Sequence, residues 1–504
     1  MADVKSIYQR LIAEIKQIAL LGSCASVLGW DKQTYMPKGG AGHRAEQLAL
    51  LSGMIHERAT APQIGDYLAE IENSDLVSDP YSEAAVNVRE LRRDYDRAIK
   101  LPRSLVEELA RVATISQQVW REAREKSDYA LFQPHLTKIL DLKHQQVRAL
   151  GNGETPYDTL LDDYEPGETT ENLTRVFSGL RDELVELVGA IAESGKKPDE
   201  NILTRTYPID QQEAFGKIAA AQIGFNFDNG RLDITTHPFC SGIGPGDTRL
   251  TTRYNTHHFS ESFFSIMHEA GHGIYDQGLN DEYYGTPMGS SISLGIHESQ
   301  SRMWENFVGR SEAFWAHFFP KVQAAFPDAL SDVSERDFYG AINTVAPSFI
   351  RVEADEATYN LHIMLRFELE QALIDGGLKA EDVPGVWNET FEKYLGITPP
   401  DDARGCLQDI HWSGGGIGYF PTYALGNLYA AQFFEQARQE VGDLDPQFAE
   451  GVFDPLKNWL TEKIYSQGQR YRANELIEVV TGKPLSHEPL MRHLRAKYEP
   501  LYGI

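Results

Sequence analysis

The stretch MHEAGHGIYDQ, residues 267–277, places His268 and His272 four positions apart, with Glu269 directly after the first histidine. On a helix, side chains four positions apart lie on one face, one turn from each other. Both imidazoles can therefore point at one cation, with Glu269 beside the open coordination position. This H-E-x-x-H spacing is typical of two zinc ligands with a general base between them. The alternative is a helix that carries two surface histidines.

The residues around this stretch favour a buried helix. Apolar side chains surround the histidines on nearly every side, and a helix that is apolar all round lies in a large core. A buried imidazole needs a polar partner, which a metal ion would supply. These side chains are Phe263, Phe264, Ile266, Met267, Ala270, Ile274, Tyr275 and Leu279.

A tetrahedral catalytic zinc needs a third protein ligand and leaves one position for water. The best candidate is Glu298 in GIHESQSRMWENF, a second helix-like segment that begins at Gly295. Spacing alone leaves this residue open, because a Glu beside Trp and Phe is equally consistent with a solvated helix position.

Composition bounds the class of protein. The 504 residues can bury a large core, and no Pro/Ser-rich linker or repeat marks a domain boundary. A formal charge of −27 argues against nucleic acid or an anionic membrane as partner. Cys24, Cys240 and Cys406 are widely spaced, so we expect neither a disulfide framework nor a cysteine metal site.

The apolar run IALLGSCASVLGW, residues 18–30, resembles the core of a signal peptide. It follows a helix-patterned segment that contains Glu14 and Lys16, and WDKQTYMP follows it in place of a cleavage site. We therefore expect a buried N-terminal helix, no stretch long enough to span a bilayer, and a cytoplasmic protein.

Helical periodicity dominates the chain. Residues 1–25, 40–75, 80–150 and 170–195 have the pattern of amphipathic helices. From Gly230 to Tyr254 side chains alternate around a Gly/Pro turn, which predicts a small antiparallel sheet just before the histidine helix. After Ser260 the pattern is helical again, apart from the glycine-rich loop SGGGIGYFPTY at 413–423.

Six short motifs give the chain a resemblance to a known family. In chain order they are HPF at 237–239, DxRxT at 247–251, HExxH at 268–272, HESQ at 297–300, IRxxAD at 350–355 and GxxQDxHW at 405–412. With these motifs, and over essentially its whole length, the chain resembles the carboxypeptidase Taq family of metallocarboxypeptidases.

The resemblance implies a mainly α, neurolysin-like fold with a deep active-site groove. It implies one catalytic domain over 1–504, in which 1–200 forms a groove wall and 201–504 binds the metal. It also implies a homodimer that releases single C-terminal residues from peptides with broad specificity, using Zn²⁺ or Co²⁺. Under this resemblance Glu298 becomes the third metal ligand.

The chemistry of peptide hydrolysis predicts roles for further residues. Glu269 takes a proton from the attacking water and passes it to the leaving amine. The oxyanion of the tetrahedral intermediate needs fixed donors. His411 and Tyr423 are candidates, with Tyr419 as an alternate, and the related angiotensin-converting enzyme has the same His-then-Tyr order. The alternative for each tyrosine is core packing with a satisfied hydroxyl.

A carboxypeptidase must also bind a free α-carboxylate, which a guanidinium does with two parallel N–H donors. Arg351 is the first candidate and Arg249 the second, on a strand expected to face the histidine helix. For Arg351 the alternative is a structural ion pair with Glu353, Asp355 or Asp247.

Three more residues are candidates around the site. His237 precedes a proline, which fixes an extended geometry, and it either lines the groove or is a buried turn residue. Asp276, one turn after His272, is placed to accept from the other ring nitrogen of that ligand. Asp409 competes for a similar role beside the candidate oxyanion histidine.

Two other functions stay open from the motifs alone. An endopeptidase or dipeptidyl carboxypeptidase on the same fold would share the HExxH–Glu set. A catalytically silent helical interaction protein would have no physical need to keep His268, Glu269, His272 and Glu298 together.

Overall fold

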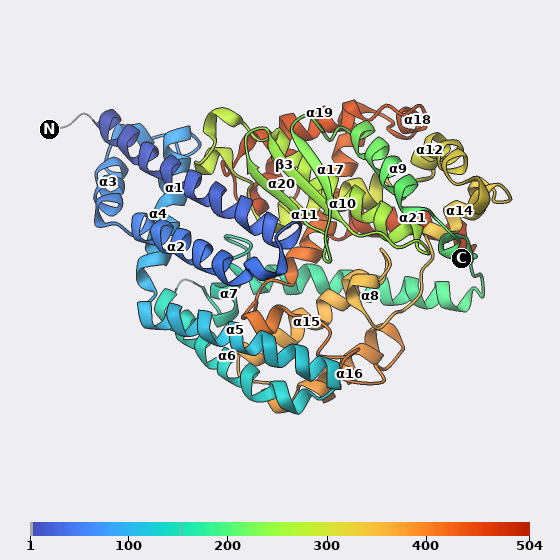
Figure 1. Ribbon diagram of the computed structural model, residues 1–504, viewed down its shortest axis with the longest axis horizontal. Helices are drawn as coiled ribbons and strands as arrows, with labels where there is room; N and C mark the ends of the chain where they lie inside the picture. The colour runs from blue at the N-terminus through green and yellow to red at the C-terminus, as the bar shows by residue number, and fades with distance from the viewer. Residues whose placement is uncertain (1–3, 152) are drawn as a thin grey trace.

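Helices make up most of the computed structural model, which describes residues 4–151 and 153–504 (Figure 1). The N-terminal helices are α1 (Val4–Gln33), α2 (Ala41–Ala59), α3 (Pro62–Glu72), α4 (Glu83–Lys100), α5 (Arg103–Lys126), α6 (Tyr129–Leu150), α7 (Pro156–Leu161) and α8 (Thr170–Glu193). The mainly helical fold expected from the sequence is confirmed. Residues 1–3 of the first predicted helix lie outside the described residues.

The long predicted segments are divided where local chemistry ends a helix. The segment 80–150 becomes three helices, because Pro102 caps α5 and Ser127 ends that helix in a left-handed conformation with φ of 52°. Asp128 then caps α6 by accepting from the backbone N–H of Ala130.

The second half of the chain contains α9 (Ile209–Gln222) and α10 (Phe259–Gly278), then α11 (Leu294–Arg302), which continues into the π-helical segment η6 (Met303–Val308). After these come α12 (Glu312–Ala325), α13 (Pro327–Leu330), α14 (Glu335–Ile342), η7 (Arg351–Glu353), α15 (Tyr359–Ile374), α16 (Val383–Leu395), η9 (His411–Gly414), α17 (Pro421–Val441), α18 (Asp445–Ala449), α19 (Asp454–Lys463), α20 (Ala473–Thr481) and α21 (Glu488–Tyr502).

The small sheet is mixed, so the expectation of a purely antiparallel sheet is wrong. Its strands are β1 (Gly230–Ile234), β2 (Cys240–Gly244) and β3 (Asp247–Thr252), in the order β1-β3-β2. The Gly/Pro turn joins β2 and β3 as the expected antiparallel pair, but β3 then inserts between β2 and β1 and runs parallel to β1. Alternation cannot reveal this, because both pairings place side chains on opposite faces.

The sheet lies between α10 and the end of α1. Leu250 of β3 packs near Gly273 of α10, whereas the neighbouring Arg249 lies over the Trp30 ring of α1, 4.3 Å from its centroid. The strand therefore contacts the histidine helix as expected, but the Arg249 side chain is on the opposite face.

The helix α1 departs from the sequence expectation in length and burial. It continues beyond residue 25 to Gln33, and only Ile7, Leu11 and Trp30 are buried. Among the described residues it is the single helix long and apolar enough to cross a bilayer, so the expectation that no stretch is long enough is wrong. Such a helix near an N-terminus is weak evidence for a membrane span, because signal sequences and core helices share the same composition.

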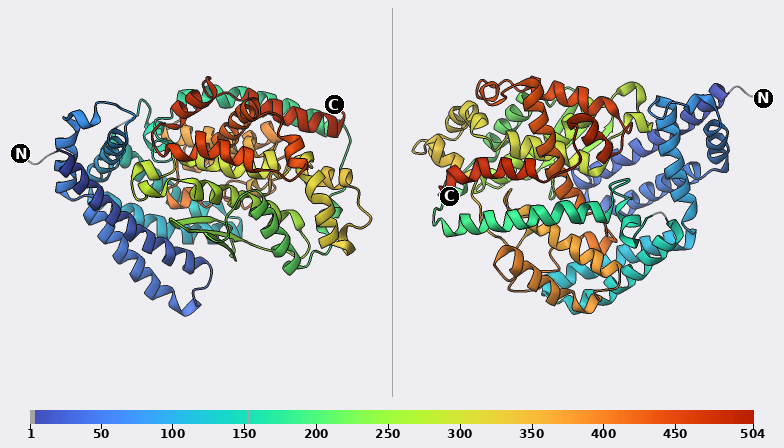
Figure 2. Two further views of the ribbon diagram at one scale, coloured as in Figure 1. Left: turned by 90° about the horizontal axis from the view of Figure 1, so that it is seen from above. Right: turned by 180° about the vertical axis from the view of Figure 1, so that it is seen from behind.

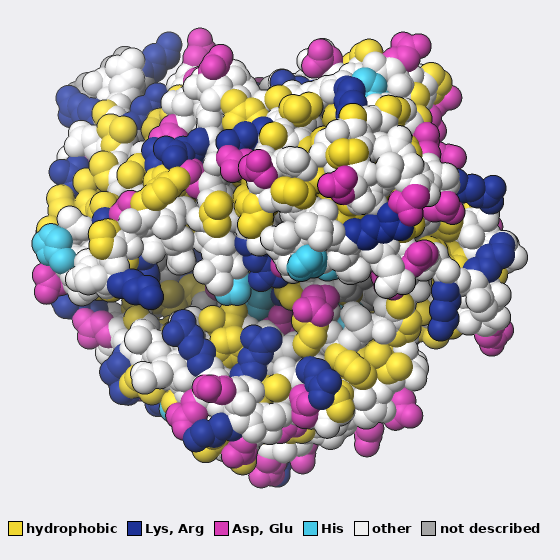
Figure 3. All heavy atoms as spheres, turned by 45° about the vertical axis from the view of Figure 1, so that its right-hand side comes forward, with side chains coloured by type: hydrophobic (Ala, Val, Ile, Leu, Met, Phe, Trp, Pro, Cys, Tyr) yellow, Lys and Arg dark blue, Asp and Glu magenta, His cyan; other side chains and the backbone are white. Residues whose placement is uncertain are grey.

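One hydrophobic core joins residues from Trp120 to Tyr502, and a smaller cluster joins α1, α3 and α4. Figure 2 shows α1 and α2 as a pair at one edge of the molecule. Figure 3 shows a hollow that crosses the middle of another face, with histidine side chains inside it and charged side chains along its rim.

Candidate active site

Two glycines bring three helices close together around Glu298. A Cβ atom on Gly271 of α10 would lie 2.6 Å from the Gln300 carbonyl oxygen of α11, which is impossibly close. A Cβ atom on Gly426 of α17 would lie 2.4 Å from Cγ of Glu298 itself. Glycine at both positions therefore lets α10 and α17 enclose α11 and fixes Glu298 opposite the histidine face of α10.

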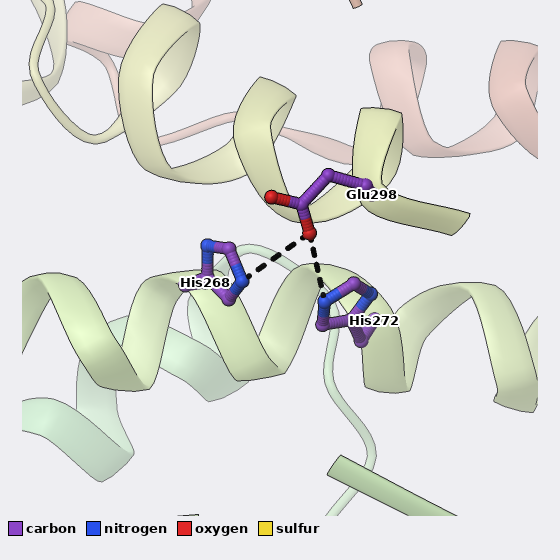
Figure 4. Close-up of side chains that lie close together, drawn as sticks. All are labelled: His268, His272 and Glu298. Carbon is purple, nitrogen blue, oxygen red and sulfur yellow. Dashed lines mark ion pairs between the residues drawn. The ribbon is translucent and has the colours of Figure 1, made fainter. Parts of the chain in front are cut away.

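Three donor atoms meet between α10 and α11 (Figure 4). The Glu298 Oε2 atom lies 3.6 Å from His268 Nε2 and 3.4 Å from His272 Nε2, and the donors of the three residues lie within 4.8 Å of one another. Ligands about 2.1 Å from a tetrahedral zinc are about 3.4 Å apart. Two nitrogens and one carboxylate oxygen at this spacing fit a divalent transition metal.

The other nitrogen of His268 binds Glu305, a residue that the sequence reasoning missed. His268 Nδ1 lies 2.9 Å from Glu305 Oε2. Glu305 lies in η6, and π-helical turns are frequent at functional sites. Burial alone would raise the pKa of Glu305, but Arg302 and His268 outweigh burial and lower it to about 2.

Arg302 contacts both the Glu298 and the Glu305 carboxylates. Its Nε atom donates to Glu298 Oε1 at 2.7 Å, and its Nη1 atom lies 3.4 Å from Glu305 Oε2. Although burial opposes ionisation of Glu298, this guanidinium and the two histidines hold its pKa well below the usual range. Glu298 therefore faces the histidines as a carboxylate, the form that binds a metal.

Asp276 reaches His272 only through a second histidine, so the expected direct contact is wrong. His297 Nε2 lies 2.9 Å from Asp276 Oδ1, and His297 Nδ1 lies 2.5 Å from His272 Nδ1. His297 comes from α11 and occupies the place where a carboxylate was expected. Its position directly before Glu298 in HESQ is the signal that could have identified it.

Glu269 is buried beside these ligands, with 7% of its surface exposed. Burial, helped by the nearby Glu298 and Glu305 carboxylates and opposed by His268, raises the pKa of Glu269 to about 7. A carboxyl group with a pKa near neutrality can both accept and return a proton.

His411, Tyr419 and Tyr423 form one cluster. His411 Nε2 lies 3.2 Å from the Tyr423 hydroxyl oxygen, and the Tyr419 ring lies 5.2 Å from His411 and 5.4 Å from Tyr423. Burial is the main cause that raises the pKa of Tyr423 well above its usual value, and Glu298 is among the nearby groups that add to it. Burial also lowers the pKa of His411 to about 4, so this imidazole is neutral near pH 7.

Arg351 is paired, but with none of the three acids expected. Its Nε and Nη2 atoms donate to Asp409 Oδ1 at 3.0 and 2.8 Å, and Nη1 donates to the Tyr359 hydroxyl at 3.0 Å. Asp355 is turned away because it accepts from the backbone N–H groups of Ala357 and Thr358. The Arg351 guanidinium also lies 4.9 Å from the centre of the Tyr423 ring.

Asp409 lies between two guanidinium groups. Arg366, which is fully buried, donates from Nε to Asp409 Oδ2 at 2.7 Å. Burial would raise the pKa of Asp409, but Arg366 and Arg351 hold it far below the usual range. Asp409 does lie near the oxyanion candidate as expected, with Oδ1 3.9 Å from His411 Nδ1, which is too long for a hydrogen bond.

Arg249 and His237 lie on the sheet side. Arg249 is held by Asp247, with both contacts at 2.7 Å, and this explains why Asp247 is not a partner of Arg351. His237 is exposed in the loop between β1 and β2, so the alternative of a buried turn residue is wrong.

Comparisons with known proteins agree with this geometry. A family model described as carboxypeptidase Taq (M32) metallopeptidase matches residues 10–498. This chain belongs to the carboxypeptidase Taq (M32) family. It is 46% identical to thermostable carboxypeptidase 1 of Thermus thermophilus over 98% of this chain and 99% of that protein. Carboxypeptidase 1 of Bacillus subtilis is 38% identical over 97% of each chain.

Solved structures of the M32 family have the same fold. The M32 carboxypeptidase from Deinococcus radiodurans R1 is 39% identical, with a TM-score of 0.96 over 99% of this chain and all of that one. The protein is therefore a metallocarboxypeptidase, a peptide hydrolase. The alternative hypothesis of a catalytically silent helical interaction protein is wrong.

Proposed function

We propose that this M32 enzyme removes single residues from peptides with a free C-terminus, with broad residue preference. The observation that supports this most directly is the convergence of the His268, His272 and Glu298 donors beside a buried Glu269. The His411–Tyr423 pair lies near Glu298, and the negative charge of Glu298 contributes to the raised pKa of Tyr423.

His268, His272 and Glu298 are the residues that would hold Zn²⁺ or Co²⁺. When bound, such a cation acidifies a water molecule and polarises a carbonyl group as a Lewis acid. Glu305 fixes the orientation of His268 by binding its Nδ1 atom, which faces away from Glu298. His297, itself bound by Asp276, does the same for the Nδ1 atom of His272.

Glu269 moves the proton. It accepts the proton of the attacking water as the new C–O bond forms, and it donates that proton to the amine nitrogen as the C–N bond breaks. Burial favours both steps because it makes the protonated and ionised forms of Glu269 similar in free energy near neutral pH.

His411 and Tyr423 stabilise the oxyanion, with Tyr419 as the alternate donor. A neutral imidazole and a protonated phenol can each offer a hydrogen to developing negative charge. The burial that lowers the His411 pKa and raises the Tyr423 pKa keeps both groups in these forms.

The substrate carboxylate is attracted to the positive charge of Arg351, which lies next to the Tyr423 ring. Arg351 and Arg366 bind the same carboxylate, so Asp409 neutralises at most one of these two guanidinium groups. Arg351 is our candidate for the substrate carboxylate, and Arg249 and His237 are candidates on the sheet side.

Hydrolysis of matched peptides tests this function. An N-blocked dipeptide with a free C-terminus should be cleaved, and a chelator should stop the reaction until Zn²⁺ or Co²⁺ is restored. The same peptide with a C-terminal amide should be nearly inert, because it lacks the charged partner that the guanidinium requires. Equal cleavage of acid and amide would instead indicate an endopeptidase.

We also propose that two copies associate through α1 and α2 in the cytoplasm. Helix α2 has no buried residue, residues 17–30 of α1 have no charged side chain, and Leu20 and Leu50 are 57% and 66% exposed. The uncharged stretch of α1, next to α2, in which two arginines balance two glutamates, lets two chains of charge −27 meet without local repulsion and close a four-helix bundle.

Light scattering after size-exclusion chromatography tests this pairing. Leu20→Glu with Leu50→Glu should convert a dimer to a monomer. Val479→Glu, at a residue on α20 that is 56% exposed, should leave the dimer intact. Flotation of the wild-type protein with lipid vesicles would show instead that a bilayer covers α1.

A further inference from the structure

Among the described residues, two fully buried carboxylates lie outside the reacting groups, and each binds the backbone of a different part of the site. These are Glu165, between α7 and α8, and Glu370, on α15; both have 0% of their surface exposed. A buried carboxylate is costly unless donors satisfy it. The donors that each one binds therefore indicate what it holds in place.

Glu370 binds both ends of the loop that follows His411. Its Oε1 atom accepts from Trp412 Nε1 at 2.8 Å, and its Oε2 atom accepts from the backbone N–H of Gly418 at 3.0 Å. The hydroxyl of Tyr157 donates to Oε2 at 2.7 Å. His411 directly precedes Trp412 and Tyr419 directly follows Gly418, so this single carboxylate sets the separation of two candidate oxyanion donors.

The loop depends on outside support because it contains little that is rigid. Residues 413–418 include four glycines, and Gly418 has a φ of 91°. A Cβ atom on Gly418 would lie 3.0 Å from the Leu160 backbone, so the loop is pressed against α7. Glycine-rich backbone has many alternative conformations, and fixing one of them requires specific contacts.

Helix α15 supplies a second contact one turn earlier. Arg366, four residues before Glu370, binds Asp409 at 2.7 Å, just before His411 in the chain. Residues four apart share one helix face. On that face Arg366 thus binds Asp409, which precedes His411. Glu370 on the same face binds the N–H groups of Trp412 and Gly418, which follow it.

Glu165 makes an equivalent set of bonds in the metal half. It accepts from Ser293 Oγ at 2.8 Å, from the backbone N–H of Gly295 at 2.9 Å and from the Tyr429 hydroxyl at 3.3 Å. Ser293 caps α11, and Glu298 lies one turn further along that helix. Glu165 therefore holds the start of the helix that carries the candidate metal ligand.

We propose that Glu370 is a positioning residue for the oxyanion donors and that Glu165 is the corresponding positioning residue for the metal ligand Glu298. This inference rests on the proposed function, because it assigns supports to the roles given there to His411, Tyr419 and Glu298. The two carboxylates divide the site into parts that can be disturbed separately.

Neutral isosteres separate the two roles. In Glu370→Gln an amide group must face N–H donors, so we expect kcat to fall about 10- to 100-fold with KM and the Zn²⁺ dissociation constant within about twofold of wild type. In Glu165→Gln we expect the Zn²⁺ dissociation constant, measured by competition with a chromophoric chelator, to rise about 10-fold or more. Glu168→Gln, at a buried carboxylate that accepts from the Thr169 backbone N–H and the Asn172 side-chain amide, is the matched control and should change neither.

A double-mutant cycle excludes a merely structural role for Glu370. If Glu370 acts through the oxyanion donors that flank its two bonds, Glu370→Gln should cost much less in a His411→Ala background than in wild type. Fully additive losses would overturn the proposal, as would an altered Zn²⁺ affinity in Glu370→Gln or an unaltered one in Glu165→Gln. The Zn²⁺ measurements need no turnover, so their outcome is independent of the substrate assigned above.

A milder variant covers the case in which Glu370→Gln does not fold. Trp412→Phe removes one N–H donor to Glu370 and keeps an aromatic ring at this buried position. It should lower kcat in the same direction by a smaller factor, again with unchanged Zn²⁺ affinity. Unfolding of both variants at 25 °C would assign Glu370 to the stability of the fold and overturn the positioning role.

Discussion

The two halves of the site are built in different ways. In the metal half, the donors and the side chains bonded to them come from α10, α11 and η6, and His297, Glu298 and Glu305 lie within nine residues; Glu165 holds the start of α11 from outside these elements. In the oxyanion half, Arg351 pairs with Asp409 across 58 residues, and the support of the 411–419 loop comes from α7 and α15. Helical spacing sets the two histidines of the first half and the short segment that contains Glu298 and Glu305, whereas the second half depends on tertiary packing throughout.

This difference predicts how each half responds to substitution. A ligand on a rigid helix has no substitute nearby, so its loss should be complete. The oxyanion half has three candidate donors and two guanidinium groups, so single losses there should be partial.

The largest expected effect is loss of a metal ligand. His268→Ala or Glu298→Ala should leave too few donors to hold the cation, and both metal content and turnover should disappear. Elemental analysis of the purified variants measures this. Full metal occupancy in Glu298→Ala would remove this residue from the ligand set and weaken the contrast between the halves.

Glu269→Gln should retain the metal but lose most of its catalytic activity. The amide has the shape of the carboxyl group but cannot accept the proton of the attacking water, so kcat should fall by about 10²–10⁴-fold. Metal content equal to that of wild type is the necessary control. Substantial residual turnover would show that another group accepts the proton.

Arg351→Ala should affect only substrates with a free carboxylate. We expect a loss of about 2–4 kcal/mol in transition-state stabilisation for a free-acid peptide, measured as kcat/KM, and little change for its amide. The acid-over-amide preference should therefore shrink. If the preference stays intact, the anchor moves to Arg249, which is held by Asp247 and stacked on Trp30.

Tyr423→Phe should have a partial effect on kcat. Removing the hydroxyl takes away one donor and keeps the ring that packs near Arg351, so kcat should fall about 10- to 1000-fold with unchanged metal affinity. The matched variant Tyr419→Phe should cost less. An unchanged kcat in Tyr423→Phe would return this tyrosine to core packing and leave His411 or Tyr419 as donor.

The same division explains what the sequence could reveal. Spacing on a helix was enough to bring His268 and His272 to one face, and apolar neighbours were enough to predict that the helix is buried. The sequence could not reveal that Asp409 binds Arg351, because that pair depends on how η7 and the 405–412 segment pack. Glu370 was missed for the same reason, since its partners come from α7 and the glycine-rich loop.

Some errors came from choices that local patterns leave open. Alternation over 230–254 predicted strands but not the insertion of β3 between β1 and β2. The prediction that Asp276 binds His272 relied on one helix alone, and a histidine from α11 occupies that place. In each case a neighbouring segment occupies a position that local spacing assigns to another residue.

The smallest expected effect sharpens the comparison within the metal half. Glu305→Gln keeps an acceptor at the His268 Nδ1 atom but removes the negative charge that makes this ligand more basic. The dissociation constant for Zn²⁺ should rise about 10- to 100-fold, while kcat at saturating Zn²⁺ should change little. Glu312→Gln, at an exposed residue of α12, should have no effect. A fall in kcat that added Zn²⁺ does not restore would mean that Glu305 also acts on Glu269, whose pKa it helps to raise, and that the metal and proton-transfer roles are not separable.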